Sequence, residues 1–240
     1  MTLPDISRAA RRLYCVRCLR PQSNCLCRWV TPVDCQVKVV ILQHPLEVDN
    51  AKGSARLLHL CLPGSRLVVG DLFSQQDLAE PGQPPLQAML LYPQDAASSP
   101  TALPMPPRAL SAQVRLDPAA VQLIVIDGTW RKSRKILHQN AWLRNLPRLS
   151  LQGQSASRYV IRKAHGAHQL STLEATCAAL VALEATADEV AEHEGGGAHK
   201  FAPLLAAFDG FVSDVLRRRT GQQGGEAQRC RAGEAGGAGV

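Results

Sequence analysis

The stretch VQLIVIDGTWRKSRKIL, Val121–Leu137, decides the fold class of this chain. Its apolar run ends abruptly at Asp127, and a Gly-Thr-Trp turn leads from there into a basic segment with helical spacing. A continuous apolar run closed by a turn is typical of a buried strand in a parallel sheet. Open α/β sheets bind ligands just beyond the carboxyl ends of such strands, so we expect Asp127 at the mouth of a binding site.

Segments of strand and helix character alternate along the chain, which predicts an α/β fold with a mostly parallel sheet and flanking helices. Runs rich in Val, Leu and Ile predict strands at residues 36–43, 66–69, 87–92, 122–127 and 148–151. Helical spacing and end signals predict helices at residues 55–60, 130–138, 140–146, 171–187 and 200–219. The end signals include Ser54, a candidate N-cap, and a capping box that begins at Ser171.

Composition limits the class of protein. The chain has 240 residues, of which 45% are hydrophobic, and a formal net charge of +7, which favours an anionic partner. It has no apolar run of membrane-spanning length and no signal-peptide core, so we expect a cytoplasmic protein without membrane contact. We divide it into a cysteine knuckle at 1–30, a main domain at 31–219 and a disordered tail at 220–240, where large apolar residues are nearly absent.

Four cysteines, Cys15, Cys18, Cys25 and Cys27, lie within 13 residues of one another. Disulfides are rare in a reducing compartment, so clustered thiols there more often bind a metal ion. Four thiolates complete the tetrahedral coordination of Zn²⁺ and leave no open position, which predicts a structural zinc site. The alternative is a cluster of reduced cysteines without a metal.

Asp127 has two interpretations. At the end of a buried strand its carboxylate is placed to accept a proton or to orient a reacting N–H group. Asp is also a common N-cap, and the following helix offers that role. Trp130 is likewise either a ring that stacks on a base or an ordinary core aromatic.

Polar residues also follow the end of the strand predicted at residues 36–43. His44 and Glu47 follow residues 36–43 directly. We expect Glu47 to orient a substrate or to pair with Arg56, and His44 to be a binding residue or a loop histidine without chemistry.

The chain from Gly128 to Leu173 contains many cations but no Asp or Glu. Lys and Arg contacts to phosphates give salt-sensitive nucleic-acid binding, whereas a charged helix face is otherwise simply solvated. Arg131, Arg134 and Lys135 share one face of the predicted helix. The predicted RNA-binding set is His44, Glu47, Arg56, Arg131, Lys132, Arg134, Lys135, Arg158, Arg162 and Lys163.

The motifs together resemble the DTW-domain family of tRNA-uridine aminocarboxypropyltransferases. The resemblance rests on CVRC and CLC in the knuckle, HPLE, LLYP, VIDGTWRKSRKIL and LSTLEA, and it spans about Cys15 to Glu184. It implies a SPOUT-like fold with a knotted S-adenosylmethionine site. It also implies transfer of the 3-amino-3-carboxypropyl group to N3 of a tRNA uridine, which leaves methylthioadenosine.

The resemblance also implies roles for individual residues. Asp127 would orient the uridine imide or assist its deprotonation, and Thr129 and Trp130 would complete the catalytic set. Three loops would hold the cofactor largely through backbone groups, with the residues Leu91, Tyr92, Pro93, Ile126, Gly128, Ser171, Thr172 and Leu173. One departure is Gly53-Ser54, where the family has Asn-Thr. A different target uridine or RNA would follow if that Asn contacts the substrate.

Two alternatives remain open from the sequence. One is a SPOUT-like RNA methyltransferase with the same cofactor, and the other is a zinc-containing RNA-binding module without catalysis. The sequence does not distinguish a monomer from a homodimer.

Overall fold

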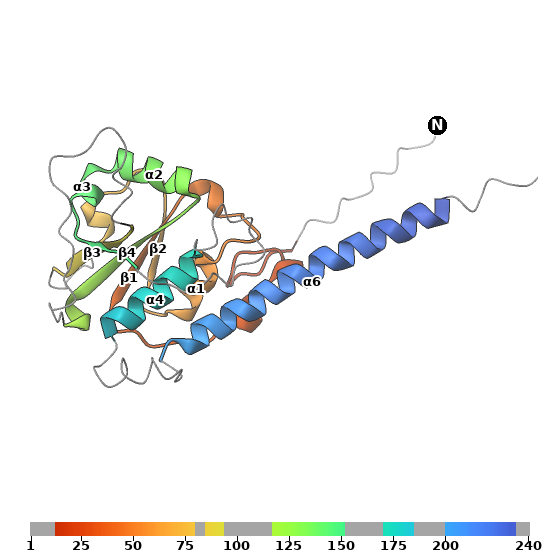
Figure 1. The fold of residues 1–240 in the computed structure, drawn as a ribbon, viewed down its shortest axis with the longest axis horizontal. Helices are drawn as coiled ribbons and strands as arrows, with labels where there is room; N and C mark the ends of the chain where they lie inside the picture. The colour runs from red at the N-terminus through yellow and green to blue at the C-terminus, as the bar shows by residue number, and fades with distance from the viewer. Residues whose placement is uncertain (1–12, 80–84, 94–116, 152–169, 185–199, 234–240) are drawn as a thin grey trace, which may run out of the picture.

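Five parallel strands form the central sheet of the computed structural model (Figure 1). The structure describes residues 13–79, 85–93, 117–151, 170–184 and 200–233. The five predicted strands and the parallel sheet are confirmed. The strands, in the order β2-β1-β4-β3-β5 across the sheet, are β1 (Lys38–Gln43), β2 (Arg66–Val69), β3 (Gln87–Leu91), β4 (Val121–Asp127) and β5 (Arg148–Leu149).

Strand β4 lies at the centre of the sheet, between β1 and β3. Successive side chains of a strand point to opposite faces, so Ile41 of β1 joins one buried cluster and Leu42 joins the other. Because the strands are parallel, their carboxyl ends meet at one edge of the sheet. Gln43, the last residue of β1, lies opposite Asp127, the last residue of β4.

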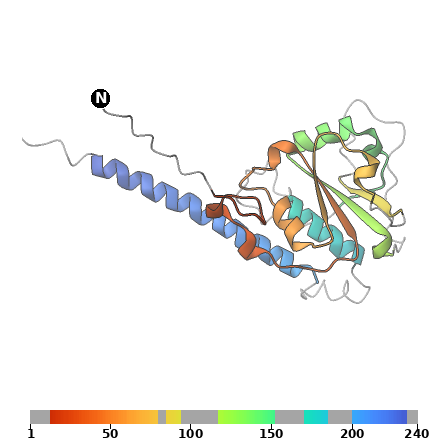
Figure 2. The ribbon, with the colours of Figure 1, turned by 180° about the vertical axis from the view of Figure 1, so that it is seen from behind.

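Helices cover both faces of the sheet (Figures 1 and 2). α1 (Ala55–Cys61), α4 (Thr172–Glu184) and α6 (Ala202–Gly233) contribute to one apolar cluster, whereas α2 (Trp130–Gln139) and α3 (Ala141–Arg144) contribute to the other. None of the helices in the described ranges combines the length and hydropathy needed to cross a lipid bilayer.

Asn140 separates α2 from α3 and makes α3 shorter than the helix predicted at 140–146. Its Nδ2 group donates hydrogen bonds to the carbonyl oxygens of Ile136 and Asp71, at 2.7 and 2.8 Å. Its Oδ1 atom accepts a hydrogen bond from the backbone N–H of Phe73. The side chain therefore caps the end of α2 and ties it to a loop.

The cysteine knuckle, residues 15–27, lies against α6 although the two are far apart in the sequence (Figure 1). Cys18 and Leu26 belong to the same buried cluster as Phe211 of α6. Arg28 and Trp29, which follow the knuckle, add polar contacts to α6. Both donate hydrogen bonds to Asp214 of that helix, Trp29 through Nε1 at 2.8 Å. The knuckle therefore shares the core of the main domain, and the domain boundary at residue 30 stays a prediction.

Helix α6 differs from the sequence prediction at its C-terminal end. The helix was expected to end at residue 219, but it continues to Gly233, so residues 220–233 are helical where a disordered tail was predicted. Gln, Ala, Glu and Arg in this segment have favourable helix propensity, which the scarcity of large apolar residues does not reveal. Residues 234–240 lie outside the described part of the chain.

Candidate functional site

Asp127 is the centre of the predicted site, and its carboxylate is buried at the carboxyl edge of the sheet. The residue is only 5% exposed. Its Oδ2 atom accepts a hydrogen bond from Gln43 Nε2 at 2.9 Å, and its Oδ1 atom accepts one from Thr172 Oγ1 at 2.6 Å. Each oxygen thus faces a donor, which is the pairing that an ionised carboxylate requires when it is buried.

The interpretation of Asp127 as the N-cap of α2 is wrong. Thr129 occupies the N-cap position, and its Oγ1 atom accepts a hydrogen bond from the backbone N–H of Lys132 at 3.4 Å. Asp127 is therefore left for the contacts with Gln43 and Thr172, which come from two other segments of the chain.

The start of α4 brings Thr172 to Asp127, and the predicted capping box that fixes this start is confirmed. The backbone N–H of Ser171 donates to Glu174 Oε2 at 2.7 Å, and the backbone N–H of Glu174 donates to Ser171 Oγ at 3.2 Å. The N–H of Leu173 donates to Ser54 Oγ at 3.4 Å. The N–H groups of Ser171 and Leu173 are thus already engaged.

Two aromatic rings form one wall of the site. Tyr92 follows β3 and Trp130 begins α2, and their ring centroids lie 5.8 Å apart in an edge-on arrangement. Tyr92 is only 4% exposed, whereas Trp130 is 42% exposed and so is not an ordinary core aromatic. The guanidinium of Arg148 lies over the Tyr92 ring at 5.5 Å and donates to the carbonyl oxygen of Pro93 at 3.2 Å.

Burial shifts the pKa values of two residues in this wall, Tyr92 and Arg148. It raises the pKa of the Tyr92 phenol, although the nearby charges of Arg134 and Arg148 oppose the shift. Burial also lowers the pKa of Arg148, and only a negative charge on the Tyr92 oxygen would oppose that shift. The phenol therefore stays neutral at physiological pH, and its buried oxygen has no hydrogen-bond partner among the described residues.

The three loops assigned to the cofactor converge on this edge. Leu91 pairs with Val125 in the sheet, Tyr92 touches Trp130, and Thr172 bonds to Asp127. Gly128 lies in the second of these loops, and a Cβ atom there would meet Lys132 Cβ at 3.1 Å, which is a tight contact.

The polar residues His44 and Glu47, which follow β1, are buried, and Glu47 contacts α2. Glu47, which is 4% exposed, pairs with Lys132 at 2.8 Å and accepts a hydrogen bond from Asn50. The pairing of Glu47 with Arg56 stays a prediction. His44 is also buried, with Nδ1 accepting from the N–H of Leu46 and Nε2 at 3.1 Å from Asp71.

The predicted RNA-binding residues therefore occupy different environments. His44 and Glu47 are buried and serve the local network rather than an open surface. Lys135 is exposed and pairs with Asp71 at 3.1 Å. Arg131 and Arg134 are exposed on α2, and Arg56 is half-buried. Arg158, Arg162 and Lys163 lie outside the described residues.

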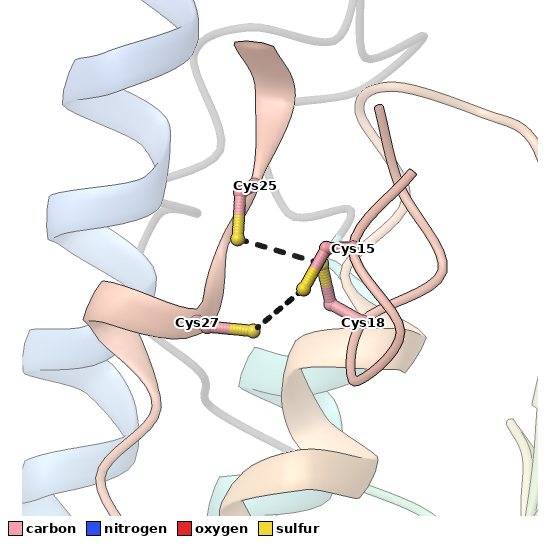
Figure 3. Close-up of side chains that lie close together, drawn as sticks. All are labelled: Cys15, Cys18, Cys25 and Cys27. Atoms are coloured by element: carbon pink, nitrogen blue, oxygen red, sulfur yellow. Dashed lines mark hydrogen bonds between the residues drawn. The ribbon is translucent and has the colours of Figure 1, made fainter. Parts of the chain in front are cut away.

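The four cysteines of the knuckle converge, as Figure 3 shows. Their sulfur atoms all lie within 4.8 Å of one another. The Sγ atoms of Cys15 and Cys27 are 3.6 Å apart, and those of Cys18 and Cys25 are 3.8 Å apart. Tetrahedral coordination with metal–sulfur bonds of about 2.3 Å places neighbouring sulfurs about 3.8 Å apart, so the cluster could hold one metal ion.

The pKa values of these thiols shift in opposite directions. Hydrogen bonds from the backbone of Cys18 and Arg17 lower the pKa of Cys15 to about 6. Burial, together with the neighbouring sulfurs, raises the pKa of Cys27 to about 12. Four adjacent thiolates repel one another unless a cation compensates their charge, so a divalent metal ion would stabilise the ionised cluster.

Sequence reasoning missed Gln43, and it placed Ser54 correctly at the N-cap position of α1 without predicting the contact of its side chain. Gln43 is a polar residue that ends an apolar strand, the same signal that identified Asp127. Ser54 precedes α1, but its hydroxyl makes no cap and instead accepts from Leu173. Gly53 is crowded, because a Cβ atom there would lie 3.2 Å from the carbonyl oxygen of Asn50.

Comparison with known proteins gives a consistent family. The DTW domain model matches residues 12–216. A mouse protein named tRNA-uridine aminocarboxypropyltransferase 2 is 33% identical over 185 residues, which are 75% of this chain and 59% of that protein. Proteins of the same name from Macaca fascicularis and Drosophila melanogaster are 32% and 31% identical, over 73% and 72% of this chain and 58% and 68% of their own lengths. The match thus spans less than two thirds of the two mammalian relatives. No solved structure matches the chain.

Proposed function

Because this chain belongs to the DTW-domain family, we propose that it transfers the 3-amino-3-carboxypropyl group of S-adenosylmethionine to N3 of a uridine in tRNA, releasing methylthioadenosine. The observation that carries the proposal is the buried Asp127 carboxylate, fixed between Gln43 and Thr172 at the carboxyl edge of the sheet. The printed names of the relatives support the same reaction class.

Asp127 performs the central step in this proposal. The sulfonium of S-adenosylmethionine is an activated leaving group, so the protein must mainly position the uridine and help remove its N3 proton. Asp127 orients the imide N–H and accepts that proton as the new N–C bond forms and the C–S bond breaks. Gln43 and Thr172 hold the two carboxylate oxygens, and such positioning lowers a barrier by several kcal/mol, roughly.

The cofactor pocket is assigned to the loops around residues 91–93, 126–129 and 170–173. The exposed ring of Trp130 offers a stacking face, and Tyr92 with Arg148 supports it from behind. The third loop offers mainly backbone carbonyl groups, since the N–H groups of Ser171 and Leu173 and the hydroxyl of Thr172 are engaged. In this proposal the sheet is a SPOUT-like core whose knot encloses the pocket.

The metal and the compartment complete the proposal. Cys15, Cys18, Cys25 and Cys27 bind one structural Zn²⁺, because four sulfur ligands at tetrahedral spacing suit zinc. The cysteines in the described residues are all free thiols, which agrees with a reducing compartment such as the cytoplasm. The exposed cations of α2 contact the tRNA near the target uridine.

The experiment combines purified protein, unmodified tRNA transcript and S-adenosylmethionine, with mass spectrometry of the digested nucleosides. We expect a uridine that carries one aminocarboxypropyl group. Asp127→Asn should lower turnover by about 10²-fold or more and leave tRNA affinity within a few-fold. Asp117→Asn is the matched control, because Asp117 caps a short turn just before the same strand, at the opposite edge of the sheet.

Other outcomes separate the alternatives. A methylated nucleoside would replace the proposal with an RNA methyltransferase. Salt-sensitive tRNA binding without any product would favour a binding module. Near-normal turnover in Asp127→Asn would remove Asp127 from the reaction.

A further inference from the structure

A groove lies between the cysteine knuckle and α6, away from Asp127. Its volume is about 820 Å³, and its walls come from the knuckle, the loop after β1 and the middle of α6. Among its lining residues are Arg20, Lys52, Phe211, Arg218 and Arg219. None of the residues that line it belongs to the edge where Asp127, Thr172 and the two aromatic rings meet.

The groove is positively charged. Its lining includes four cations, Arg20, Lys52, Arg218 and Arg219, and a single acidic residue, Asp214. The lining charge is therefore 4 − 1 = +3. Asp214 is 5% exposed and pairs with Arg28, Arg217 and Arg218, so neighbouring arginines offset its charge. An anionic ligand would meet mainly the cations.

The walls of the groove are held in place by contacts that do not depend on a ligand. Arg20 donates to the carbonyl oxygens of Ala51 and Gly53, at 3.0 and 2.6 Å, and stacks over the ring of Phe211 at 5.1 Å. This single side chain joins the knuckle, the loop after β1 and α6. A groove whose shape exists before binding loses less conformational entropy when a ligand binds.

The loop after β1 links the groove to the Asp127 site. Lys52 contributes to the groove, and Asn50, two residues earlier, donates to Glu47 at 2.7 Å. Glu47 in turn pairs with Lys132, in the first turn of the helix that begins at Trp130. Ser54, on the other side of the loop, accepts from the N–H of Leu173. A polymer with regularly spaced negative charges is suited to bind the groove and the Asp127 site at the same time.

We propose that this groove binds the phosphodiester backbone of the tRNA and so anchors the molecule whose uridine reaches Asp127. The proposal rests on the proposed function for the identity of the RNA. The charge of the groove matches phosphates, and the adjacent Tyr14, which is 55% exposed, offers a ring on which a base stacks.

The test removes two cations from the groove and compares a matched pair elsewhere. Lys52→Gln/Arg219→Gln leaves Arg20 and its structural contacts in place. Lys38→Gln/Arg66→Gln is the control, because it removes the same charge at the amino ends of β1 and β2, which lie at the opposite edge of the sheet. Fluorescence anisotropy with labelled tRNA transcript gives the Kd over a series of KCl concentrations, and the nucleoside assay gives turnover at saturating tRNA.

We expect the groove variant to weaken tRNA binding by about tenfold or more at moderate salt and to reduce the slope of log Kd against log salt by about two. Turnover at saturating tRNA should stay within about twofold, and the control should match the wild type in both readouts. A groove variant that binds like the control, beside a wild type that binds and modifies tRNA, would overturn the groove proposal alone. A wild type that does not bind tRNA would overturn both proposals.

Discussion

Replacing Thr172 by Val removes one donor that holds the Asp127 carboxylate and nearly preserves the shape of the side chain. Val has nearly the shape of Thr, so the substitution deletes the hydroxyl whose oxygen lies 2.6 Å from Asp127 Oδ1. The Gln43 contact to the other oxygen remains. The side chain of Asp127 should then lose its fixed orientation toward the open edge of the site.

The expected magnitude follows from the type of hydrogen bond. A hydrogen bond to a charged group stabilises by about 1.5–3 kcal/mol, and leaving a buried carboxylate partly unsatisfied has a cost in the same range. If the contact positions Asp127 for the reaction, about 1.4 kcal/mol corresponds to a tenfold change in rate. Thr172→Val should therefore lower kcat/KM by about 10- to 100-fold. Steady-state kinetics with tRNA transcript measures this.

Thr176→Val is the matched control on the same helix. The Thr176 hydroxyl donates to the carbonyl oxygen of Thr172 at 2.7 Å and does not contact Asp127. It should reduce stability slightly and leave kcat/KM within about twofold, because a neutral hydrogen bond contributes about 0.5–1.5 kcal/mol. Equal losses of kcat/KM in the two variants would refute the positioning role, since both would then act only through the packing of α4.

Three further predictions concern the metal and the stability of the fold. Metal analysis should find about one zinc per chain, and Cys15→Ser/Cys18→Ser should lose it; zinc-free wild-type protein would contradict the assignment. Glu184 is buried, which alone would raise its pKa, but hydrogen bonds from the side chain of a lysine and from backbone and thiol groups lower the pKa below 4.5. The ionised Glu184 therefore stabilises the folded state fully above about pH 4.5, and this stabilisation is lost as the pH falls through the folded pKa. In urea unfolding, Glu184→Gln should be less stable than the wild type at pH 7 but nearly equal to it in acid. Gly210→Ala should destabilise by about 1–3 kcal/mol, because its Cβ would lie 2.2 Å from an indole ring, whereas Gly64→Ala, with nothing within 4 Å, should not; equal thermal midpoints would contradict this packing.

Local signals predicted most of the elements. The apolar run before Asp127 and the capping box at Ser171 fixed β4 and the start of α4, because both depend on contacts within a few residues. The end of α6 was not predicted, since composition alone does not distinguish a polar helix from a disordered tail. Lys132 was not predicted as a partner of Glu47, because the two residues lie 85 positions apart in the sequence.

What the sequence by itself determined is the class of fold, the cluster of four cysteines and the family. Each of these follows from periodicity, spacing or a short motif. Only the tertiary structure decided that Gln43 and Thr172 hold Asp127, because these contacts join residues 84 and 45 positions apart. It also decided that the knuckle meets α6, where Arg28 and Asp214 are 186 positions apart. The physical reason is that hydrophobic burial selects the fold from local pattern, whereas long-range partners are set by how the buried faces pack together.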